Sequence, residues 1–389
     1  MAEARIPKGS TVRLGRVEGD LRAENHALIQ ALDGSGVVVT GKAHFEGNVE
    51  VDCNLECASL ESTDGLVRVN GGLLVHGDID VEDALYTKEN LKAQRIDVGG
   101  RLSVGMSLEA KTADVGGSLE VQGNSEVETV DVGGSFVVLG EARLKDLDVG
   151  GRVELGGGEV TGVAEVGGTL ASRKALRFGR IEAGGTIELI GGEGEAIEVG
   201  GKLQSKGDLK CQKIEVGGLV EVEGKLSGRD VEVGGRLRVS GDIELVGHLE
   251  IGGVAEIGGI LSGADIEIGG TLRAAKALIT GSAEVGGCVE TTGGLKASRI
   301  ELGRRATCIG AIVGGTVNIG KASQVQDVYC SRLVAEHGAK LGKVYAESVY
   351  FEDDCVVEKL VYTKELVEGE RVRHQSPPQK SESLPPFPL

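Results

Sequence analysis

The chain has 389 residues, a formal net charge of −18 and 65 glycines, but only five Tyr, five Phe and no Trp. A uniformly acidic protein repels phosphate backbones, which argues against a nucleic-acid partner, and no apolar run approaches the roughly 20 residues of a membrane span. Val, Ile and Leu are plentiful, so the composition indicates a folded chain with a narrow core of short side chains. The first residues lack an apolar signal core, and we expect a cytoplasmic location.

The N-terminal part, residues 1–82, shows strand and corner patterns without a constant period. The segment 11–21, with Val12, Leu14, Val17 and Leu21 in alternation, is typical of short strands. We therefore predict a less regular β-helical segment here. The distance in sequence from Gly71 to the next Gly-Gly doublet, at Gly99, is longer than one repeat. We assign the additional residues to the segment 83–93 and predict that it is an inserted helix or loop.

Residues 94–356 carry a regular repeat marked by Gly-Gly doublets. The step from Gly99 to Gly116 is 17 residues, and later steps stay between 16 and 18 until Gly286. We expect each doublet to form a tight corner, because glycine adopts positive φ and lets backbones stack closely. The first glycines of the doublets are Gly99, Gly116, Gly133, Gly150, Gly167, Gly184, Gly200, Gly217, Gly234, Gly252, Gly269 and Gly286.

Apolar residues follow the same period in three pairs per repeat. One set of pairs is Leu102 and Val104, Leu108 and Ala110, and Ala113 and Val115. Residues two apart in a strand share a face, so each pair indicates one short side and each longer step a corner. The sequence therefore predicts an all-β fold, a single-stranded β-helix (β-solenoid) of triangular cross-section with about 17 residues per winding. About 18 windings fit between Val37 and Val357.

The C-terminal part departs from this repeat. Residues 81–89 and 357–365 share a Val-Glu pair and a Tyr-Thr-Lys-Glu run, which suggests one boundary device used twice. We therefore interpret residues 357–373 as a C-terminal cap or boundary segment. Residues 374–389 are polar and Pro-rich, and this composition predicts a disordered tail.

An outward carboxylate precedes each doublet, so stacked windings should place these side chains in one acidic stripe. Like charges about 4 Å apart repel by about 1 kcal/mol in water, so the stripe favours either a solvated face that opposes lateral contact or a surface for divalent cations or a basic protein. Its residues are Asp97, Asp114, Asp131, Asp148, Glu165, Glu182, Glu198, Glu215, Glu232, Glu250, Glu267, Glu284 and Glu301.

The two ends of a solenoid carry unpaired strand edges and must be capped or joined to another chain. Aromatic residues gather near the C-terminal end, and aromatics are enriched at interfaces. We expect either a wider, capped terminal core or a polymer joint that uses Tyr345, Tyr350, Phe351 and Tyr362.

Enzyme signatures are weak. The histidines are isolated, the corners are short, and sugar-binding grooves need aromatics that this chain lacks. We expect no catalytic residues, no cofactor and no dedicated metal site, and no enzymatic activity. A polysaccharide-active β-helix enzyme and a monomeric rod acting as a surface or adhesion spacer remain the alternatives.

The Ile-x-Val-Gly-Gly-x-Leu units, such as residues 96–102, together with the opening 17–23 and the Pro-rich tail, resemble the bactofilins, a family of polymer-forming β-helical cytoskeletal proteins. The resemblance covers most of the chain. It implies a right-handed β-helix and a cytoskeletal or scaffolding protein that self-assembles end to end into nucleotide-independent filaments. The expected partner is then another copy of the same chain.

Overall fold

The chain folds as a parallel β-solenoid of about 22 turns with about 17 residues per turn. The computed structural model describes residues 3–386, and these residues form β-strands and connecting corners without any helix. Accordingly, no helix that could cross a membrane occurs in this range. The predicted all-β solenoid and its repeat length are confirmed.

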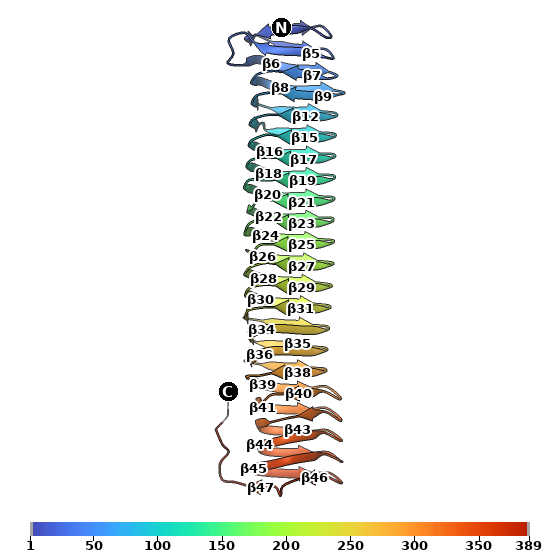
Figure 1. Cartoon of the computed structure of the whole chain (residues 1–389), viewed down its shortest axis with the longest axis vertical. Helices are drawn as coiled ribbons and strands as arrows, with labels where there is room; N and C mark the ends of the chain where they lie inside the picture. The colour runs from blue at the N-terminus through green and yellow to red at the C-terminus, as the bar shows by residue number, and fades with distance from the viewer. Residues whose placement is uncertain (1–2, 387–389) are drawn as a thin grey trace. The chain divides into compact units, whose positions relative to one another are not determined.

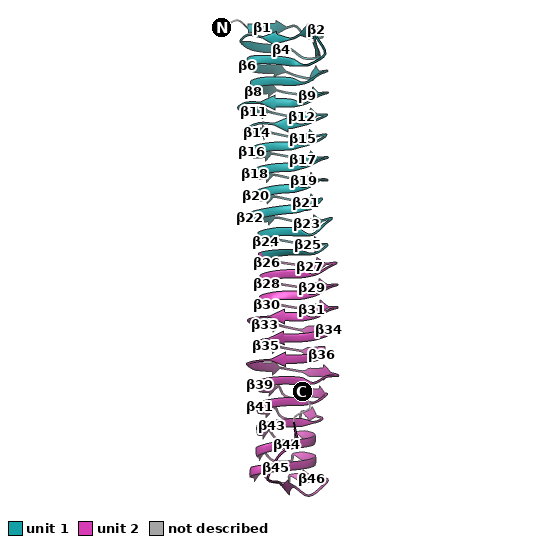
Figure 2. Ribbon diagram, turned by 90° about the vertical axis from the view of Figure 1, so that its left-hand side faces the viewer, with its two compact units in different colours: residues 1–194 teal, residues 195–389 magenta. Residues whose placement is uncertain are grey.

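Two compact units divide the chain, residues 1–194 and residues 195–389 (Figure 2). The strands of the first unit are β1 (Glu3–Ile6), β2 (Thr11–Leu14), β3 (Arg16–Val17), β4 (Asp20–Ala23), β5 (Ala27–Ala31), β6 (Val37–Glu46), β7 (Val49–Val51), β8 (Leu55–Thr63), β9 (Leu66–Val69), β10 (Leu73–Val75), β11 (Asp78–Val81), β12 (Ala84–Thr87), β13 (Leu91–Lys92), β14 (Arg95–Val98), β15 (Arg101–Val104), β16 (Leu108–Val115), β17 (Ser118–Val121), β18 (Ser125–Val132), β19 (Ser135–Val138), β20 (Ala142–Val149), β21 (Arg152–Leu155), β22 (Gly158–Val166), β23 (Thr169–Ser172), β24 (Leu176–Ala183) and β25 (Thr186–Leu189).

β26 (Gly192–Val199) begins in the first unit. The strands that follow are β27 (Lys202–Ser205), β28 (Leu209–Val216), β29 (Leu219–Val222), β30 (Leu226–Val233), β31 (Arg236–Val239), β32 (Ile243–Leu245), β33 (His248–Ile251), β34 (Val254–Gly263), β35 (Asp265–Ile268), β36 (Thr271–Ile279), β37 (Ser282–Val285), β38 (Cys288–Thr291), β39 (Leu295–Leu302), β40 (Thr307–Ile309), β41 (Ile312–Ile319), β42 (Gln324–Val325), β43 (Val328–Ala335), β44 (Lys340–Phe351), β45 (Val356–Glu368), β46 (Arg373–His374) and β47 (Gln379–Lys380).

Each regular winding has three sides, which we number from the doublet. In one winding of the first unit, side 1 is β15, side 2 is the start of β16 (108–110), and side 3 is its end (112–115), which leads into the next doublet. Side 1 strands such as β15, β17 and β19 stack directly on one another (Figure 1). Leu102 pairs in register with Leu119, and Ala113 with Val130, and all four side chains are at most 1% exposed. The inward columns predicted from the alternation are therefore the core.

The doublet corners are tight because successive backbones nearly touch there. A Cβ built on Gly116 would lie 2.2 Å from the carbonyl oxygen of Gly99, and one on Gly133 would lie 2.2 Å from that of Gly116. Neither glycine is among the residues with positive φ. The close approach of the windings therefore requires glycine at these doublets, and positive φ, the other reason expected from the sequence, does not apply there.

The predicted excursion at residues 83–93 is wrong. β12 pairs in register with β9 and β15, and β13 pairs with β10 and β16, so this segment is an ordinary part of the solenoid. The misleading count started from Gly71, which lies at the corner between sides 1 and 2. At the doublet corner of that winding the chain instead has Glu82 and Asp83, over which Gly99 and Gly100 stack.

The N-terminal windings belong to the same stack, although their lengths vary. In-register partners are 22 residues apart at Arg22 and His44, and 19 residues apart at Glu61 and Asp80. Strand pairing in the first unit starts at Glu3, well before the Val37 from which the windings were counted. This earlier start, together with windings beyond Val357, explains why about 22 turns are present where about 18 were expected.

The C-terminal part continues the solenoid. β45, which covers residues 356–368, pairs along its length with β44, so the segment 357–373 expected to be a cap or boundary consists mainly of the last complete winding. The tail expected to be disordered contributes β46 and β47, which pair with β45, and the chain then turns back alongside the second unit (Figure 1). Tyr86 and Tyr362 lie on different sides, sides 1 and 2, so the shared motif is no common device. The last predicted tail residues, 387–389, lie outside the described residues.

Candidate functional site

The predicted acidic stripe is present as a column of in-register residues on side 3 of each unit. In the first unit, Asp97 pairs with Asp114, and the column continues through Asp131, Asp148 and Glu165 to Glu182. In the second unit the column runs in register from Glu215 through Glu232, Glu250, Glu267 and Glu284 to Glu301, and Glu198 precedes it on the exposed face of β26. Asp97, Glu182 and Glu215 are half-buried and the other ten are exposed.

Stacking changes the electrostatic environment of Asp131. Burial raises the pKa of its carboxyl group, and the charges of Asp114 and Asp148 in the windings on either side raise it further. Burial first, and the two neighbouring carboxylates second, therefore disfavour ionisation of Asp131.

Basic residues pair with several carboxylates of the column. The pairs are Arg95 with Asp97 at 3.4 Å, Arg180 with Glu182 at 2.5 Å, Lys213 with Glu215, and Arg299 with Glu301 at 3.6 Å. Within residues 3–386, no group of three or more His, Cys, Asp or Glu side chains has a geometry that could hold a metal ion. The column offers one carboxylate per winding, which differs from the convergent ligands of a calcium site.

The charge of the side 3 column reverses near its N-terminal end, which the sequence did not reveal. Glu61 and Asp80 extend the acidic run, but His44, Arg22 and Arg5 precede them in register. The varying winding lengths hide this continuation from residue counting.

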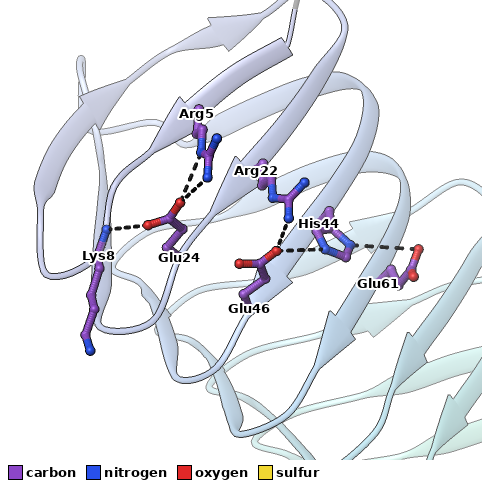
Figure 3. Close-up of polar contacts among 7 residues, drawn as sticks. All are labelled: Arg5, Lys8, Arg22, Glu24, His44, Glu46 and Glu61. Atoms are coloured by element: carbon purple, nitrogen blue, oxygen red, sulfur yellow. Dashed lines mark hydrogen bonds and ion pairs between the residues drawn. The ribbon is translucent and has the colours of Figure 1, made fainter.

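Ion pairs link this basic end internally (Figure 3). Arg5 binds Glu24 at 2.6 Å, and Glu24 also accepts a hydrogen bond from the backbone N–H of Lys8 at 3.2 Å. His44 lies between two carboxylates, 3.6 Å from Glu46 and 3.9 Å from Glu61, and Glu46 also pairs with Arg22.

The four aromatic residues expected at a joint do not form one patch. Phe351 is 0% exposed and belongs to the core, so its assignment as a contact residue is wrong: it occupies the inward phase of side 3. Tyr350, next to it, points outward and is 45% exposed. Tyr345 lies on side 2, where its ring stacks on Tyr329 with centroids 4.9 Å apart, and Tyr362 is half-buried on the same side.

Polar residues close the core at the C-terminal end of the second unit. The inward columns that contain Phe351 and Val357 continue to Glu368 and His374, respectively. Glu368 and His374 form an ion pair, and the His374 ring packs edge-on against Phe351 at 6.2 Å. β46 covers side 1 and β47 covers side 2 of the last complete winding. On side 3, by contrast, no strand within residues 3–386 pairs with the outer edge of 364–368.

The cysteines show no reactive centre. All seven are free, and burial raises the pKa of four thiols to about 12, so these are protonated at neutral pH. The four are Cys57, Cys211, Cys308 and Cys330. Four of the six histidines lie beside carboxylates, for example His76 beside Glu56 at 2.9 Å; the other three are His44, His337 and His374.

No protein-family model matches this chain, and neither the curated proteins nor the solved structures contain a match. What the chain shares with other proteins is therefore established only at the level of its architecture, a β-solenoid of about 22 turns.

Proposed function

We propose that the chain is a non-enzymatic scaffolding protein that assembles with further copies of itself end to end, without nucleotide. The observation that carries this proposal is the set of unpaired strand edges at the solenoid ends. β1 pairs with β4 on one edge alone, and the outer edge of 364–368 has no strand partner within residues 3–386. Unpaired edges with free N–H and C=O groups are templates for pairing with another chain.

The resemblance to bactofilins supports the same function, since those proteins form cytoskeletal polymers from β-helical subunits. The proposal extends to a cytoplasmic location, because seven unpaired cysteines suit a reducing compartment.

The acidic column fits this role as a solvated face. A stripe with one like charge per winding opposes side-by-side contact and leaves the ends as the favoured points of association. If the column instead recruits divalent cations, millimolar Ca²⁺ or Mg²⁺ will increase light scattering, and unchanged scattering supports the solvated face.

Sedimentation velocity and negative-stain microscopy of the purified chain over a wide concentration range test the proposal. Concentration-dependent association that persists without nucleotide is the expected result. A monomer at every concentration would overturn it and favour the monomeric spacer.

A further inference from the structure

The two ends of the described chain are complementary in the order of their sides. At the start of the first unit, β1 lies on side 3, β2 on side 1 and β3 on side 2, because they pair with β4, β5 and β6, which occupy these sides. Sides 1, 2 and 3 follow one another in every winding, so the described strands begin with the last side of a winding.

The end of the second unit shows the opposite situation. After β45 completes side 3 with residues 364–368, β46 adds a side 1 strand and β47 a side 2 strand. A side 3 strand would come next, but none is present within residues 3–386. The winding is therefore left without the one side with which the first unit begins.

We propose that copies of this chain join head to tail, with β1 of one copy pairing in parallel with residues 364–368 of β45 in another. The repeat then continues across the joint, with β2 placed over β46 and β3 over β47. This inference rests on the proposed function and adds to it the polarity of assembly and the strands of the joint.

The register of the joint follows from the columns. Ala4, Arg5 and Ile6 occupy the positions of side 3 that Leu366, Val367 and Glu368 occupy at the other end. Arg5 would thus lie over Val367, which is 42% exposed and stands between Leu366 and Glu368. Pairing covers this apolar side chain and satisfies the free backbone edge.

The order of the sides, rather than net charge, sets this polarity. Residues 3–18 carry four basic side chains and two acidic ones, and residues 364–380, which supply all three sides of the other end, carry four basic and three acidic ones. Both ends therefore have a small positive net charge, and the pairing of a side 3 strand with the missing side 3 position is what selects a head-to-tail joint. Because the two surfaces differ, the contact is heterologous and each added copy exposes a new acceptor edge.

Two variants that each block one end test the polarity. Arg5→Glu reverses the charge on β1, with Arg101→Glu as its control, because Arg5 and Arg101 are similarly exposed (63% and 65%) and each faces one glutamate. Val367→Lys places a charge on the acceptor edge, with Val246→Lys as its control at a corner of the second unit, where Val246 is 82% exposed. We expect each end variant to weaken self-association about tenfold or more and the controls to leave it unchanged.

Mixing the two end variants gives the decisive result. Val367→Lys keeps an intact head and Arg5→Glu an intact tail, so sedimentation of the mixture should show association between the two variants, although neither associates alone. The two altered ends carry opposite charges in this register, so larger species than dimers also support the inference. A head-to-head joint would leave Val367→Lys able to dimerise by itself, and a tail-to-tail joint would do so for Arg5→Glu; either result overturns the inference. Absence of association in the unmodified chain would instead refute the proposed function. Circular dichroism and urea unfolding establish that each variant folds.

Discussion

Substituting alanine for a doublet glycine tests whether close stacking of windings holds the corners. In Gly133→Ala the new Cβ would lie 2.2 Å from the backbone oxygen of Gly116, whereas ordinary contact begins near 3.4 Å. The corner must open by more than 1 Å, although the strand ladder on both sides fixes the spacing of windings at about 4.8 Å.

The cost can be bounded from both folded and unfolded chains. Overpacking against atoms that cannot move away costs about 1–3 kcal/mol, and the obstacle here is backbone. Alanine also lowers the conformational entropy of the unfolded chain relative to glycine, and this stabilises the folded state by about 0.4–1 kcal/mol. The difference lies between about 0 and 2.6 kcal/mol, and because the obstacle is backbone on a fixed ladder we expect Gly133→Ala to destabilise the first unit by about 1–2 kcal/mol, in the middle of this range.

Gly72→Ala is the matched control, because it lies at a different corner, has no positive φ, and its new Cβ would meet no atom closer than 3.6 Å. Its stability should stay the same or rise slightly. Hydrogen exchange followed by mass spectrometry is the suitable assay, since long repeat arrays need not unfold in two states. Peptides from β16 and β18 should exchange faster in Gly133→Ala alone. Equal protection in the two variants would refute the argument from close stacking.

Further predictions concern the core and two carboxylates. Phe351→Ala should destabilise the second unit by about 3–5 kcal/mol by leaving a cavity, while Tyr350→Ala should change urea unfolding little; equal effects would contradict the burial of Phe351. The raised pKa of Asp131 means that its ionised form destabilises the fold, so Asp131→Asn should be stabilising at pH 7. That gain should vanish as the pH falls through the window between the raised native pKa and the ordinary value of about 3.9. Urea midpoints measured across this range would contradict the raised pKa if the gain persisted in acid. Asp265 behaves oppositely: hydrogen bonds from the hydroxyl and backbone N–H of Ser282, at 2.6 and 2.7 Å, lower its pKa. The contribution of Asp265 to stability should be present above the ordinary pKa and be lost as the pH falls through the lowered native value. Asp265→Asn should therefore lower the urea midpoint at pH 7, and an unchanged midpoint would argue against these hydrogen bonds.

The repeat could be predicted from the sequence because its signal is local and recurs many times. Val98 and Leu102 keep their places relative to the doublet, and the inward columns follow from that reference point. The same reference fails where the doublet is absent. After Gly320 no doublet marks the phase, so Phe351 could be assigned to the surface although it lies in an inward column.

The structure of the two terminal parts could not be predicted from composition. A Pro-rich segment is typically disordered, yet Gln379 and Lys380 pair with Val361 and Tyr362 because the edge of β45 offers them partners. The basic start of the side 3 column was equally hidden, since the 22-residue step from Arg22 to His44 breaks the count. Only the register of the strands shows that the first described winding consists of side 3 alone and that the last one has sides 1 and 2 but no side 3.

The doublet corner also governs how the windings can change in length. In every winding that has the doublet, the connection from side 3 to side 1 has two residues, for example between β14 and β15. Extra residues occur at the other corners, such as 32–36 before β6 and Val246 before β33. Peptide insertions or fused domains should therefore be accepted at these two kinds of corner and rejected at the doublet. In each unit, the row of doublet corners then keeps a constant length, and the other two rows of corners can vary.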